Sequence, residues 1–192
     1  VYNICIFPSH GWGITAVDFF NEVSLLYGIV LEEDLPSMGP GEGFPSGFEY
    51  LWADGVRVKS PVRCSGPEYV DYVMTWVEEQ INNDDLFPGS SGTSHTSSLS
   101  SSSSRPSISP LRPRGMNRQA FPAKFPEQIK QIFTRLFRVF AIMYTQHFTK
   151  MERLGAVAHL NTSFKHFIFF TWEFDLVERR ELEALSSIVG EL

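Results

Sequence analysis

The segment Pro126–Met143, PEQIKQIFTRLFRVFAIM, has the clearest helical pattern in the chain. Apolar residues recur in it every three or four positions, as on the buried face of an amphipathic helix. They are Ile129, Ile132, Phe133, Leu136, Phe137, Phe140 and Met143. The opposite face is polar and carries Lys130, Thr134, Arg135 and Arg138, while Met143, His147, Met151 and Leu154 extend the apolar stripe. This pattern predicts a long helix at the centre of the fold.

Four further segments predict helices that pack around it. They are Ala16–Tyr27, a helix capped by Ser65 that runs to Ile81, a helix opened by Asn161, and Val177–Leu192. The helix after Asn161 is apolar almost all round, so we expect it in the middle of the bundle. Around Asp54-Gly55, two short runs predict one small β-hairpin, because Asp-Gly suits a tight turn. The expected fold is an all-α helical bundle with one small hairpin.

Composition excludes several protein classes. The 192 residues are 43% hydrophobic, which predicts one domain with a substantial core, and the two cysteines cannot form a disulfide scaffold. No apolar run reaches the roughly 18–20 residues of a membrane span. The first twelve residues have neither a positive region nor a small-residue cleavage site, so we expect no secretory signal.

Charge is distributed unevenly along the chain. The net charge is −6, but the segment from Gly89 to Lys124 holds five basic residues and no acids, leaving 11 basic against 22 acidic residues elsewhere. An acidic body repels phosphate backbones, so we expect a basic peptide or helix as partner, not nucleic acid. Residues 89–118 are rich in Ser, Pro and Arg, which predicts a disordered insert within the single domain.

Several strings resemble the MOB family of kinase co-activators, the Mob/phocein proteins. They are VDFFN (17–21), LYG (26–28), EYLWADG (49–55), YVDY (69–72), TWV (75–77), LFP (86–88), RLFRVFA (135–141) and AHLNTSFKHFIFF (158–170). Together they are closest to the branch that binds NDR/LATS-type kinases. The resemblance covers residues 16–192 apart from the glycine-rich loop at Pro36–Ser46, which contains Gly39, Gly41 and Gly43, and the serine-rich insert. Residues 1–13 do not resemble the family, so we interpret them as a divergent or truncated start before a domain of residues 14–192.

The resemblance implies a helical bundle without catalytic activity, located in the cytoplasm or nucleus. Such a protein binds the basic N-terminal extension of an NDR/LATS-type AGC kinase on an acidic surface, where Asp18 and His166 match family positions and Glu22 lies one turn from Asp18. It also implies a pocket for a phosphopeptide of an upstream kinase or scaffold, with Arg135 and Arg138 as the matching arginines. The family lysine that precedes them is Thr134 here, which predicts weaker phosphate binding.

The resemblance further implies a structural zinc held by a Cys-x4-Cys loop and a His-x4-His pair, but this chain departs from that pattern. The positional equivalents are Val30, Leu35 and Ile142, and only His147 remains. One imidazole cannot form a four-ligand site, so we expect no cofactor and an aliphatic replacement for zinc. His147 is then a core histidine, and Cys64 a small buried residue.

Two other functions remain open at this point. A degenerate MOB paralogue would fold but fail to activate a kinase, as the missing zinc ligands and N-terminal acids allow. A metal-dependent enzyme would have to use His147, His159 or His166, and no catalytic motif accompanies them. We therefore expect a protein that is not an enzyme. For Arg135 and Arg138, a merely solvated helix face is the alternative to a phosphate pocket.

Overall fold

The structure, a computed structural model, describes residues 8–31, 37–87 and 122–190, and in the first helix it describes side chains from Thr15 onward. The helices are α1 (Pro8–Leu31), α2 (Gly66–Ile81), α3 (Phe125–Gln146), α4 (Phe148–Arg153), α5 (Val157–Glu173), α6 (Arg179–Leu182), the 3-10 turn η1 (Glu183–Leu185) and α7 (Ser186–Val189). The expected disordered insert and residues 1–7 lie outside the described part of the chain. The described residues form an all-α fold, as predicted.

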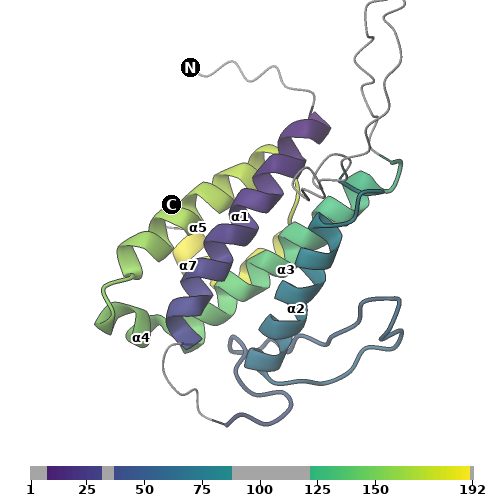
Figure 1. The fold of residues 1–192 in the computed structure, drawn as a ribbon. Coiled ribbons are helices and arrows are strands. Elements are labelled where there is room, and N and C mark those ends of the chain that lie inside the picture. Colours follow the sequence, from purple (N-terminus) through teal and green to yellow (C-terminus); the bar gives the residue numbers. More distant parts are fainter. Residues whose placement is uncertain (1–7, 32–36, 88–121, 191–192) are drawn as a thin grey trace, which may run out of the picture.

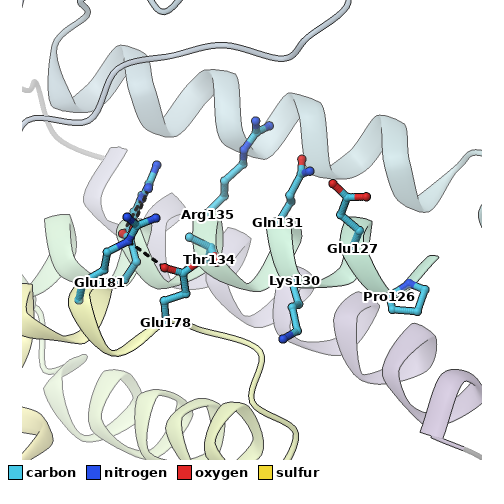
Figure 2. A pocket seen from close by; sticks show the side chains of 10 residues that line it. Pro126, Glu127, Lys130, Gln131, Thr134, Arg135, Glu178 and Glu181 are labelled. Carbon is cyan, nitrogen blue, oxygen red and sulfur yellow. Dashed lines mark hydrogen bonds and ion pairs between the residues drawn. The ribbon is translucent and has the colours of Figure 1, made fainter. Parts of the chain in front are cut away.

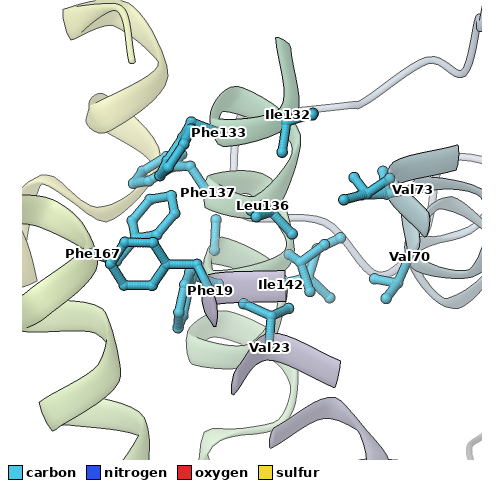
Figure 3. Close-up of a cluster of buried hydrophobic side chains, with 14 of the residues drawn as sticks. Phe19, Val23, Val70, Val73, Ile132, Phe133, Leu136, Phe137, Ile142 and Phe167 are labelled. Atoms are coloured by element: carbon cyan, nitrogen blue, oxygen red, sulfur yellow. The ribbon is translucent and has the colours of Figure 1, made fainter. Parts of the chain in front are cut away.

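Helix α3 packs against α1, α2, α4 and α6, and α1 also contacts α2, α4 and α5 (Figure 1). The predicted apolar stripe of α3 explains this central place, because every member from Ile129 to Met143 is fully buried. Figure 3 shows the aromatic part of the core, where Phe19 of α1 lies near Phe133 of α3 and Phe167 of α5. Its ring centroid is 5.9 Å from that of Phe133 and 5.1 Å from that of Phe167. This cluster fixes α1 and α5 side by side.

The start of α2 follows the predicted capping chemistry. The Ser65 Oγ accepts a hydrogen bond from the Glu68 backbone N–H, and the Glu68 carboxylate accepts one from the Ser65 backbone N–H at 2.8 Å. These reciprocal bonds satisfy two donors that a helix end otherwise leaves open. Gly66 lies against Gly43 so closely that a Cβ on Gly66 would come within 2.2 Å of the Gly43 carbonyl oxygen. The glycine-rich loop is therefore held against the N-terminus of α2.

The expected hairpin forms only in part. Among the described residues, Trp52 and Val62 make one isolated antiparallel bridge and no regular strand is present. The Asp54 carboxylate accepts hydrogen bonds from the backbone N–H groups of Val56 and Val58, at 2.8 and 2.7 Å. Pro61 has no N–H to donate. The turn at Asp54 is thus present, but the Asp54 carboxylate accepts from backbone N–H groups that a longer β-ladder would use.

Helix α5 differs from its prediction in two ways. It begins at Val157, not at Asn161, because Gly155 adopts a positive φ of 70° and reverses the chain after α4. It is also not central, since Phe169 and Trp172 are each 46% exposed. The sequence of α5 contains more aromatic residues than its one buried face needs. Its apolar composition alone therefore predicted, wrongly, a place in the middle of the bundle.

The ends of two predicted helices are also wrong. His147 breaks the stripe between α3 and α4, and Leu154 is 40% exposed where the continued stripe placed it in the core. In the described residues 177–190 of the segment expected as one helix over Val177–Leu192, three short pieces form instead. Within the described ranges, no helix is both long and apolar enough to span a bilayer.

Candidate functional site

The face formed by α1 and α5 brings together the residues predicted to bind a kinase. Asp18 on α1 and His166 on α5 are both exposed. The His166 ring packs against Phe19, the residue next to Asp18, with ring centroids 5.0 Å apart. Asp18 and His166 therefore flank one buried anchor, and we call the surface that they form the α1–α5 face.

Glu22, the third residue predicted at the kinase surface, contacts α5. It is half-buried, and its carboxylate accepts a hydrogen bond from the Ser163 hydroxyl at 2.5 Å. Ser163 is buried and lies one helical turn before His166 on α5. Glu22 thus bridges the two helices and sets the position of His166 relative to Asp18.

A pocket of about 630 Å³ lies between α3 and the start of α6, residues 178–181 (Figure 2). Both predicted phosphopeptide residues, Arg135 and Arg138, are among its lining residues. The rest of the lining mixes both signs of charge and comprises Pro126, Glu127, Lys130, Gln131, Thr134, Glu178, Arg180 and Glu181. We call this cavity the α3 pocket. It contains four cationic side chains together with three carboxylates.

Arg138 is held by three internal partners. Its Nε and Nη2 donate to the two carboxylate oxygens of Glu181, at 2.9 and 2.6 Å, and its Nη1 donates to the Tyr69 hydroxyl at 3.1 Å. The guanidinium also lies over the Tyr50 ring, 4.9 Å from the centroid. Burial opposes the charged form most strongly of any single cause, but the contacts with Glu181 and Tyr69 together outweigh it and raise the pKa of Arg138.

Arg135 is stacked between aromatic rings. Its guanidinium carbon lies 3.8 Å from the centroid of Trp76 and 4.7 Å from that of Trp52. Nη2 donates to the Ala53 carbonyl at 2.7 Å, whereas Nη1 is buried without a hydrogen-bond partner among the described residues. Burial lowers the pKa of this guanidinium, although arginine stays protonated at physiological pH. The Tyr50 hydroxyl, whose ring lies beneath Arg138, is likewise buried without a hydrogen-bond partner among the described residues.

The two arginines therefore fit neither simple interpretation from the sequence. They are half-buried, so they do not form a merely solvated face, and they line a cavity that already contains internal acceptors. Sequence reasoning missed Glu181 and Tyr69, which lie 43 and 69 residues from Arg138. No local spacing connects residues so far apart, so only the fold could reveal these contacts.

The side chains in the region that the resemblance assigns to zinc are mostly apolar. The equivalents Val30 and Ile142 are fully buried and aliphatic, and Leu35 lies outside the described residues. His147 is 4% exposed, and its Nε2 has no hydrogen-bond partner among the described residues. Within the described ranges, no group of three or more His, Cys, Asp or Glu side chains is arranged to hold a metal ion. These residues do not fit a four-ligand zinc site.

A lysine ties α4 to the end of α1, next to the region that the resemblance assigns to zinc. The Lys150 Nζ of α4 donates a hydrogen bond of 2.5 Å to the Val30 carbonyl, in the last turn of α1. A cation at a helix C-terminus is favourable because the last carbonyls of a helix lack intrahelical donors. Burial, with a smaller contribution from Lys150, lowers the pKa of His147, so the neutral imidazole is favoured. Cys64 is buried as expected, and its thiol lies 3.8 Å from the Tyr50 carbonyl.

Comparisons with known proteins agree with this architecture. The model of the Mob1/phocein family matches residues 11–105 and 110–185. MOB kinase activator-like 1A of Arabidopsis thaliana is 40% identical over 176 residues, which are 92% of this chain and 70% of the relative. MOB kinase activator-like 1 homolog A of Dictyostelium discoideum is 39% identical over 183 residues, 93% of this chain and 72% of the relative. Since the family model and these relatives span nearly all of the sequence, the chain belongs to the Mob1/phocein family.

Proposed function

We propose that this protein is a non-catalytic co-activator that binds the basic N-terminal extension of an NDR/LATS-type kinase on the α1–α5 face. The observation that carries the proposal is the juxtaposition of Asp18 and His166 around Phe19. The names of the relatives, MOB kinase activators, support a role in kinase activation. The acidic balance of the chain favours a basic partner.

Calorimetry with a synthetic peptide from an NDR-type kinase extension tests this binding. At low ionic strength the wild-type protein should release heat on binding, and the Asp18→Lys variant should weaken binding at least tenfold because it places like charges together. Glu78→Lys is the matched control, since it makes the same charge change at an exposed position on α2. Equal weakening by both variants would show that net charge, and not the α1–α5 face, governs binding.

A kinase assay with the same partner separates activation from binding alone. An activator raises the kinase rate, whereas a degenerate MOB paralogue binds the extension and leaves the rate unchanged or competes with another activator. A protein that neither binds nor activates would contradict the proposal altogether. The absence of heat with every extension tested at low salt would have the same consequence.

We further propose that the α3 pocket binds a phosphopeptide from an upstream kinase or scaffold. Guanidinium groups bind phosphate through paired N–H donors, and Arg135 and Arg138 both line the pocket. A phosphothreonine peptide should bind the wild-type protein, and Arg138→Glu should abolish that binding. Circular dichroism of the variant must show an intact fold, because Arg138 also pairs internally. Unchanged binding in a folded Arg138→Glu variant would remove the pocket from the proposal.

A further inference from the structure

Three of the cations around the α3 pocket are paired with acids from residues 175–181, which connect α5 to α6 and include most of α6. The pairs are Lys130–Asp175 at 3.5 Å, Arg180–Glu178 at 2.8 Å and Arg138–Glu181 at 2.6 Å. The first two pairs are on the surface, with every side chain more than half exposed. The third is shielded, with exposed fractions of 24% for Arg138 and 12% for Glu181. Exposed ion pairs are weak and screened by salt, whereas a shielded pair is not. The Arg138–Glu181 pair is therefore the contact whose replacement costs a ligand free energy.

We infer that Glu181 is an internal ligand of the pocket and that it sets a threshold of affinity which a dianionic phosphate passes and a carboxylate does not. The inference deepens the proposed binding of a phosphopeptide and rests on it. A guanidinium presents the same pair of donors to a carboxylate and to a phosphate. Glu181 already occupies that pair on Arg138, through both of its oxygens. An incoming group therefore has to replace a bidentate acceptor.

The exchange favours phosphate because of charge and the number of acceptors. A carboxylate ligand brings one negative charge and two oxygens, so it replaces Glu181 without gain. A phosphorylated threonine carries about 1.5 to 2 negative charges at pH 7 and three acceptor oxygens. Lys130 and Thr134 lie two turns and one turn before Arg138 on α3 and line the same pocket. They offer the third oxygen a cation and a hydroxyl that Glu181 does not contact in the described structure.

The displacement needs only a small part of the fold to move. Glu181 belongs to α6, which has four residues and no buried member. Tyr69 keeps its hydrogen bond to the Arg138 Nη1, so the guanidinium stays oriented when Glu181 leaves. An internal acceptor that competes with the ligand lowers the apparent affinity by the fraction of protein in which the site is open. Removing the charge of Glu181 should therefore tighten phosphate binding.

The test uses fluorescence anisotropy with three peptides that differ at one position, which is phosphothreonine, threonine or glutamate. Wild-type protein should bind the phosphothreonine peptide. It should not bind the glutamate peptide at protein concentrations up to a hundredfold above the dissociation constant for the phosphothreonine peptide. Binding should strengthen from pH 5.5 to 7.5, because the second ionisation of phosphate has a pKa of about 6. These measurements require no variant, so they remain decisive even where a substitution disturbs the fold.

The variant Glu181→Gln keeps the shape of the side chain and removes its charge. It should bind the phosphothreonine peptide about tenfold more tightly, the size expected when one charge-assisted contact is removed from competition. It should also bind the glutamate peptide measurably. Glu183→Gln is the matched control, because it removes the same charge two residues further along from an exposed side chain that is not among the pocket's lining residues. Its affinity should change less than twofold.

Two results would overturn the inference while leaving the pocket in place. One is equal tightening by Glu181→Gln and Glu183→Gln, which would show a general effect of charge. The other is comparable binding of the glutamate and phosphothreonine peptides to wild-type protein. By contrast, failure of every protein to bind the phosphothreonine peptide would remove the proposed pocket itself, and the inference with it.

Discussion

The α1–α5 face and the α3 pocket were predicted from the same resemblance, yet they differ in what their side chains contact. Asp18 and His166 are exposed over a buried aromatic anchor, whereas Arg138 has internal acceptors on Nε, Nη1 and Nη2. A match in sequence locates a side chain, but it does not tell whether that side chain is already paired inside the protein. The face should therefore affect binding without much effect on stability, while the pocket should affect both.

The largest expected effect comes from the anchor beneath the α1–α5 face. Phe19→Ala should lower the free energy of unfolding by about 3–5 kcal/mol, because the buried ring contacts Phe133, Phe167 and Phe170. Urea denaturation measures this loss. Leu25→Ala on the same helix is the control and should change stability by less than about 0.5 kcal/mol, since Leu25 is 64% exposed. Similar losses in both variants would contradict the assigned packing of α1.

The next effect distinguishes the pocket from the face directly. Arg138→Met should lower the free energy of unfolding by about 3 kcal/mol, because it leaves the shielded carboxylate of Glu181 without its partner. Asp18→Asn should change it by less than about 0.5 kcal/mol, because Asp18 is exposed. Denaturation of both variants under the same conditions gives the comparison. If Arg138→Met is as stable as Asp18→Asn, the internal pairing of the pocket is wrong.

A smaller effect should come from the bridge between the helices of the face. Glu22→Gln should lower the free energy of unfolding by about 1 kcal/mol, since it weakens the charge-assisted bond from Ser163. A double-mutant cycle with Ser163→Ala isolates the coupling. Additive losses in the cycle would show that the two side chains do not interact.

The pH dependence of stability provides a test at the opposite end of α3. Burial lowers the pKa of His147 below its usual 6.5, so the unfolded chain binds the proton more readily than the folded protein. The stabilisation from neutral His147 is complete above pH 6.5 and is lost as the pH falls through the folded-state pKa. His147→Phe should remove this part of the acid destabilisation. Identical pH profiles for the wild type and the variant would show that His147 does not cause it.

The smallest expected effect is that of a chelator. We propose that the Lys150–Val30 contact and the aliphatic side chains replace the zinc of the family, so EDTA should leave the thermal midpoint unchanged. Lys150→Met should lower the midpoint, because it removes the bond to the last turn of α1. Stoichiometric zinc in the purified protein, together with a midpoint that falls on chelation, would contradict this replacement.

Much of the fold could be predicted because its signals are local. The stripe of α3 repeats over several turns, and the capping box at Ser65 lies within four residues, so both were read correctly. The start of α5 was missed because Asn161 resembled a cap, whereas Gly155 sets the turn. The Arg138–Glu181 pair was missed because its partners are 43 residues apart and meet only through packing. Sequence therefore identified the candidate residues, and the fold supplied their internal partners.

The stacking of Arg135 has a practical consequence for spectroscopy. Trp52 and Trp76 are two of only four tryptophans in the chain, and a single guanidinium lies against both of their rings. A ligand that draws this cation toward the pocket changes the electric field at both indoles. Their emission therefore offers a label-free optical report of occupancy, built into the wall of the cavity itself.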